Sequence, residues 1–150
     1  MNLFLMTFVV LIFTMYVFMT VKNVNMLVVP TKRQVMWDDL VASLKKQDDT
    51  DYTEFLFNAI TAYYWVKTAF VVSVVLIYLK PWPLAVGGAG ALFILLAASA
   101  SQVNALKRAA MKLQDNSPLT TPMIITGLAE DSIGAVLLGV VLAQAAGMHL

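Results

Sequence analysis

Four apolar runs, each about as long as a bilayer is thick, constrain the fold more than any other feature of the sequence. They cover residues 2–21, 55–79, 84–104 and 123–148. A helix needs about 20 consecutive apolar residues to cross the hydrocarbon core of a membrane. Only 13% of the 150 residues are charged, whereas a soluble domain carries about 25%. The sequence therefore predicts an all-α protein, an integral membrane four-helix bundle that forms a single domain.

The breaks between these runs contain residues that end helices. Pro81 and Pro83 separate the second run from the third, and Pro118 lies between the third and the fourth. Proline lacks the amide hydrogen that the interior of a helix requires. The first run is expected to be an uncleaved anchor, because it has no basic stretch before it and no small-residue cleavage site after it.

The basic residues are distributed unequally among the loops. The first and third loops hold eight of them, and the second loop holds only Lys80; the eight are Lys22, Lys32, Arg33, Lys45, Lys46, Lys107, Arg108 and Lys112. Basic residues accumulate in the cytoplasmic loops of membrane proteins. The sequence therefore predicts a multi-pass protein with the first and third loops in the cytoplasm and both termini outside.

The first loop, residues 22–54, is long enough to contain a helix of its own. Between residues 35 and 44 the apolar side chains recur at helical spacing, and acidic and hydroxyl side chains lie opposite; the apolar set is Met36, Trp37, Leu40, Val41 and Leu44. This pattern predicts a short amphipathic helix on the cytoplasmic side. Its apolar face can lie in the lipid headgroup layer or pack on the ends of the other helices, and the sequence leaves both interpretations open.

Several functional classes are excluded or disfavoured by what the chain lacks. A net charge of +1 excludes a protein that binds nucleic acid through bulk charge. The chain has no cysteine and a single histidine, His149, so we expect no catalytic residues, no metal site and no cofactor. The nine methionines are scattered and are interpreted as packing residues. Neutral polar residues inside the spans, such as Ser99 and Gln144, are expected to satisfy one another or a neighbouring helix.

Small residues recur at steps of four along the fourth run and are also frequent in the third. Such faces allow two helix backbones to approach closely in lipid. The candidate packing residues are Gly87, Ala91, Gly127, Ala135, Gly139, Ala143 and Gly147. They can serve packing within the chain, association with copies of the chain, or association with other membrane subunits. Self-association is the preferred interpretation.

Glu130 and Asp131 are the most informative pair of residues in the sequence. If the fourth helix starts near Pro122, these acids begin about 12 Å along it. A carboxylate inside the membrane costs several kcal/mol unless it is protonated, paired or hydrated, so such acids are candidates for a functional site. An alternative register, with the apolar core running over residues 128–147, places both acids at the cytoplasmic interface.

Lys67 is the other charged residue inside a span. It follows an aromatic cluster, Tyr63 to Trp65, that is typical of a membrane interface, and we expect its amine to extend to the headgroups. Counting helical rise from the outer ends gives Lys67 and Glu130 depths that differ by about 6 Å. An ion pair of Lys67 with Glu130 or Asp131 is therefore possible, and all three residues are candidates for ion binding.

A family resemblance adds to the interest of Glu130. A run of small residues followed by a glutamine covers positions 97–102, a polar loop follows at 107–118, and the Gly-Leu-Ala-Glu sequence ends at Glu130. In this order, and over residues 84–147, the chain resembles the proton-carrying proteolipid, or c subunit, of rotary ATPases. The resemblance implies that Glu130 holds the transported ion.

Two functions follow as hypotheses. The first is a small noncatalytic membrane subunit that packs through its Gly/Ala faces into an oligomer or a larger complex. The second is a subunit that translocates a proton or a sodium ion with Glu130 or Asp131. The partners expected are the lipid bilayer and other membrane subunits or copies of the chain, and an enzyme is disfavoured.

Overall fold

The computed structural model describes residues 3–47, 50–112 and 118–148. Over these residues the fold is all-helical, as predicted, with five helices: α1 Leu3–Val28, α2 Thr31–Gln47, α3 Thr50–Tyr78, α4 Trp82–Met111 and α5 Thr121–Ala145. All but α2 are long and apolar enough to cross a membrane. The first of these four is longer than expected, because α1 continues past residue 21 to Val28.

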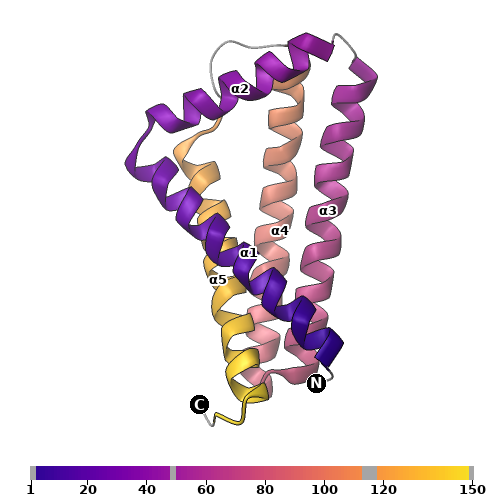
Figure 1. Cartoon of the computed structure of the whole chain (residues 1–150), viewed down its shortest axis with the longest axis vertical. Helices are drawn as coiled ribbons and strands as arrows, with labels where there is room; N and C mark the ends of the chain where they lie inside the picture. The colour runs from indigo at the N-terminus through magenta and orange to yellow at the C-terminus, as the bar shows by residue number, and fades with distance from the viewer. Residues whose placement is uncertain (1–2, 48–49, 113–117, 149–150) are drawn as a thin grey trace.

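The four long helices form an upright bundle, and α2 lies across one end of it (Figure 1). The start of α1 and the end of α5 are both at the opposite end of the bundle. Helix α1 crosses the bundle obliquely and packs mainly on α5, whereas α3 packs mainly on α4. Contacts between α4 and α5 join these two pairs. The end of α4, which carries Lys107 and Arg108, is therefore at the same end of the bundle as α2.

Proline and glycine set the ends of two helices. Pro83 lies in the first turn of α4 and Pro122 in the first turn of α5, where the missing amide hydrogen costs no helical hydrogen bond. Gly147 follows the last residue of α5 and its cap with a φ of +84°. The amide of Gly147 donates to the Gln144 carbonyl and that of Met148 donates to the Ala143 carbonyl. This Schellman arrangement needs the left-handed backbone that glycine adopts easily.

Two apolar clusters fill the interior. The larger one lies toward the chain ends and includes Val71 and Val75 of α3, Leu92 of α4 and Leu138 of α5. The smaller one lies beneath α2. On α3, α4 and α5 the residues between these clusters include buried charged and polar side chains. A polar site is therefore enclosed between two apolar layers.

Helix α2 packs its apolar face on the protein itself. Trp37 is 1% exposed and lies in the smaller cluster with Phe57 of α3 and Val103 of α4. Of the two interpretations left open by the sequence, the structure supports packing on the ends of the other helices. Arg33 fixes the start of α2, because its Nε donates to the Met26 carbonyl and its guanidinium also donates to Thr121 Oγ1 at the start of α5.

Candidate functional site

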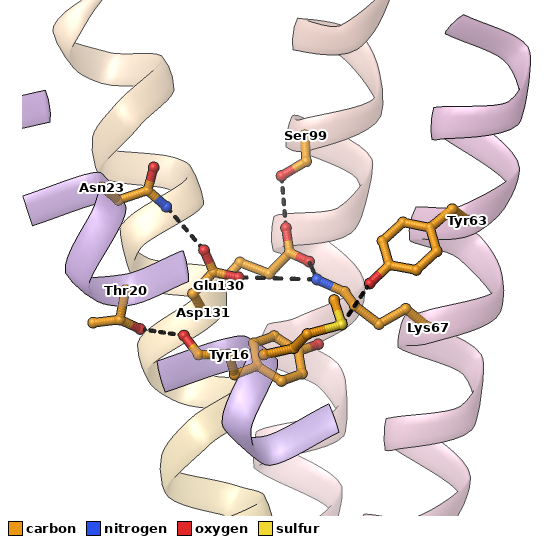
Figure 2. Close-up of polar contacts among 9 residues, drawn as sticks. Tyr16, Thr20, Asn23, Tyr63, Lys67, Ser99, Glu130 and Asp131 are labelled. Atoms are coloured by element: carbon orange, nitrogen blue, oxygen red, sulfur yellow. Dashed lines mark hydrogen bonds and ion pairs between the residues drawn. The ribbon is translucent and has the colours of Figure 1, made fainter. Parts of the chain in front are cut away.

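The three ion-binding candidates predicted from the sequence meet at one place in the bundle. Lys67 of α3 places its Nζ 3.2 Å from Glu130 Oε1 and 3.9 Å from Asp131 Oδ1 of α5. Figure 2 shows the lysine extending between the helices toward both acids. Lys67, Glu130 and Asp131, here called the buried triad, are 7%, 1% and 6% exposed. The expectation that Lys67 extends to the headgroups is therefore wrong.

Two neutral side chains hold the outer oxygens of the carboxylates. Asn23 of α1 donates through its Nδ2 to Asp131 Oδ2 at 2.8 Å, and Ser99 of α4 donates through its hydroxyl to Glu130 Oε2 at 2.8 Å. Four helices thus contribute to one cluster (Figure 2). Buried polar groups are costly unless they are hydrogen-bonded, so these contacts fix the orientation of both acids.

Aromatic rings enclose the ammonium group of Lys67. Its Nζ lies 4.3 Å from the centre of the Tyr16 ring and 4.9 Å from the centre of the Tyr64 ring. The negative face of an aromatic ring attracts a cation, and more strongly where water is excluded. The ammonium is therefore in contact with both aromatic faces and carboxylates in an otherwise apolar surrounding.

The charges of the buried triad do not balance. Two carboxylates share one ammonium, so the fully ionised triad has a net charge of −1. Glu130 Oε1 takes part in the ion pair but receives no hydrogen bond from the described residues. Burial of an uncompensated charge is unfavourable, and one additional proton or cation neutralises the triad. Glu130 Oε1 and Asp131 Oδ1 are the two oxygens that face the shared ammonium.

A cavity of about 340 Å³ leads to the acids from the end of the bundle covered by α2. Glu130 and Asp131 line its inner part, and Met36 of α2 and Leu106 of α4 line its outer part. Lys67 does not line the cavity, so the ammonium lies behind the carboxylates. Of the buried triad, a solute in the cavity therefore contacts the carboxylates and not the ammonium, and the exposed Lys22 also lines the cavity.

The candidate packing residues differ in their surroundings. A Cβ built on Gly127 would lie 3.3 Å from Asn23 Nδ2, and one on Gly139 would lie 3.4 Å from Phe13 Cε2, so both glycines face α1 of the same chain. Ala135 packs against the larger apolar cluster. Ala91 and Ala143 are half-buried. At Gly87 and Gly147 an added Cβ would have no atom within 4 Å. Gly147 lies beyond the end of α5 and is therefore not part of the row of small residues on that helix.

Sequence reasoning missed two residues at the site. Ending the first span before Lys22 places Asn23 in the first loop, although the apolar residues at positions 26–29 indicate that the helix continues. Nothing in the sequence distinguishes Tyr16 from the other aromatic residues of the first span. Its role depends on Gly134, which leaves room for the ring, and no pattern within one helix reveals such a pair.

No family model, curated protein or solved structure matches the chain. The geometry of the buried triad and of the cavity is therefore the evidence that bears on function.

Proposed function

We propose that this chain is a multi-pass membrane protein that translocates a proton through the buried triad. The observation that supports this proposal is that two buried carboxylates share one buried ammonium. In the unprotonated state the triad has a net charge of −1, and in the protonated state it is neutral. Neutralisation lowers the cost of burying the site, so proton binding and release switch the site between two electrostatic states.

The geometry favours a proton over a sodium ion. The ammonium of Lys67 already occupies the position between the two carboxylates that a bound metal cation would take. The outer oxygens are engaged by Asn23 and Ser99. A proton needs only one lone pair, and either Glu130 Oε1 or Asp131 Oδ1, the two oxygens that face Lys67, can supply it.

Access to the triad differs between the two ends of the bundle. The cavity provides a route from the end covered by α2, and the larger apolar cluster lies toward the other end. Tyr16 Oη and Thr68 Oγ1 are buried hydroxyls that have no hydrogen-bond partner among the described residues. They are the polar groups that we propose accept the proton on its way past the apolar cluster.

Reconstituted vesicles test the proposal. Purified protein is incorporated into liposomes, a potassium diffusion potential is imposed with valinomycin, and proton uptake is followed with an enclosed pH indicator. We expect uptake above that of protein-free vesicles and its loss in Glu130→Gln and in Asp131→Asn. Asp39→Asn, on the exposed face of α2, is the control and should behave as wild type. Uptake no faster than in empty vesicles, or unchanged uptake in both site variants, overturns the proposal.

A sodium gradient at equal pH on the two sides distinguishes the ions. We expect no sodium-driven uptake of charge in this arrangement. Sodium transport that is lost in Glu130→Gln would replace the proton by sodium as the transported ion.

The noncatalytic-subunit hypothesis stays a prediction, and one observation favours it. Gly87 and Gly90 of α4 are exposed and have open space where a Cβ would be, so another helix can approach the backbone there. Gly87→Leu should reduce chemical cross-linking between chains in vesicles, whereas Ile94→Leu, a change on an exposed apolar residue, should not. Equal cross-linking of both variants removes this support.

A further inference from the structure

The cavity above the buried triad has the properties of a ligand site. Its volume of about 340 Å³ lies within the range of about 300–1,000 Å³ found for small-molecule pockets. We propose that it binds a lipophilic organic monocation, whose positive group lies against Glu130 and Asp131 in place of the proton. This proposal rests on the proposed function, because the ligand and the proton neutralise the same net charge.

Four methionines give the cavity an adaptable wall. Met19 and Met26 of α1, Met36 of α2 and Met123 at the start of α5 all line it. Unbranched thioether side chains are flexible and polarizable, and they are common where a protein binds apolar partners of varied shape. These residues are far apart in the sequence, where they look like ordinary packing residues, and only the fold brings them together.

The charge at the inner end selects a cation. Glu130 and Asp131 face the cavity, and the Lys67 ammonium that they share lies behind them. Tyr64 also lines the cavity and offers an aromatic face for a cation. Among the described lining residues the remaining charged group is Lys22, which is exposed and therefore screened by water. A ligand with one positive charge neutralises the triad, whereas an anion would add to the buried negative charge.

Two ions of equal shape and opposite charge test the proposal. Equilibrium dialysis in detergent compares tetraphenylphosphonium with tetraphenylborate, with protein-free micelles as the blank for both. We expect saturable binding of the cation by the wild-type protein. We expect the anion to bind at least about tenfold more weakly, because a misplaced buried charge costs several kcal/mol. Equal binding of the two ions indicates simple partition into apolar surface and overturns the proposal.

Variants locate the cation. Glu130→Gln and Asp131→Asn should each weaken binding of tetraphenylphosphonium by about tenfold or more, since each removes a buried negative charge. Lys22→Gln should strengthen binding by about twofold, because an exposed repulsive charge is lost. Asp39→Asn is the matched acidic control and should bind as wild type does. The Lys22 variant changes an exposed residue and keeps the test informative if a triad variant fails to fold.

The cation-binding experiment and the proton-uptake experiment have independent outcomes. Proton uptake without selective cation binding retains the proposed function and rejects the ligand site. Selective cation binding without proton uptake retains the ligand site and rejects proton translocation. Unchanged cation binding in Glu130→Gln, Asp131→Asn and Lys22→Gln also rejects the ligand site.

Discussion

Gly134 of α5 leaves the space that the ring of Tyr16 of α1 occupies. A Cβ built on Gly134 would lie 2.5 Å from Tyr16 Cε1 and 2.6 Å from Tyr16 Cζ. The same ring lies against the Lys67 ammonium, whose Nζ is 4.3 Å from the ring centre. The contact between α1 and α5 therefore also positions one wall of the buried triad.

Gly134→Ala should destabilise the protein by about 1–3 kcal/mol, because a methyl group forced into a packed contact displaces its neighbours. The measurement is the free energy of unfolding in mixed micelles, followed by circular dichroism. Gly87→Ala is the matched control on α4, where an added Cβ meets open space, and should be neutral or stabilising by up to about 1 kcal/mol. Equal effects of the two variants would contradict the close packing of α1 on α5.

The docking of α2 predicts a contrast in chemical accessibility. The chain has no cysteine, so single introduced cysteines can be labelled without background. Val41→Cys should react slowly with a water-soluble maleimide, because Val41 is on the buried face of α2, and Ala42→Cys should react quickly, because Ala42 is on its exposed face. Rapid labelling at both positions would mean that α2 is released from the bundle.

The positions of the basic residues predict the orientation in the membrane. Lys32 lies in α2 and Lys112 directly follows α4, both at the end of the bundle that α2 covers, and Lys80 lies in the loop between α3 and α4 at the other end. Cysteines introduced at 32 and 112 should therefore be labelled from the cytoplasmic side, and a cysteine at 80 from the outside. If positions 32 and 112 are labelled from opposite sides, the four-span topology is wrong.

The sequence was sufficient to predict the number of long helices and the existence of α2, because both depend on patterns within one segment. Four apolar runs produce four helices, and the spacing around Trp37 produces an amphipathic fifth. The exact ends of the helices were harder to predict from the sequence. Helix α1 ends at Val28, well beyond its first charged residue, Lys22, because a charged side chain that reaches the surface of the bundle does not interrupt the backbone hydrogen bonds of the helix.

The site was only partly accessible from the sequence, because it depends on which helices become neighbours. Glu130 and Asp131 could be selected by the cost of placing acids in an apolar run. Their pairing with Lys67 was one geometric possibility, and only the packing of α3 near α5 decides it. Asn23 belongs to α1, and its contact with Asp131 requires the oblique crossing of α1 over α5.

Loss of the central cation should be more damaging than loss of a cation whose acidic partner is exposed to water. Lys67→Met leaves two buried carboxylates without their counter-charge and should cost about 3–5 kcal/mol in the free energy of unfolding. Lys107→Met removes a partner of Glu54 at 2.9 Å, but the Glu54 side chain is 55% exposed, so its cost should be about 0–1 kcal/mol. Combining Lys67→Met with Glu130→Gln should recover part of the loss, because one of the unpaired charges is removed. Additive effects in this double variant would show that the two residues do not interact.

Tyr16 allows the structural and functional demands on the site to be separated. Its hydroxyl is buried and has no hydrogen-bond partner among the described residues, while its ring packs on Gly134 and faces Lys67. A buried polar group without a partner costs about 1–3 kcal/mol. Tyr16→Phe keeps the ring and removes this cost, so it should stabilise the protein in the unfolding assay.

If the Tyr16 hydroxyl also accepts the proton from the triad, the same variant should slow proton uptake in vesicles several-fold. Tyr63→Phe, which alters an exposed tyrosine of α3, should leave uptake unchanged. A Tyr16→Phe protein that is more stable and transports at the wild-type rate would remove this hydroxyl from the proposed proton path and leave the triad as its only tested component.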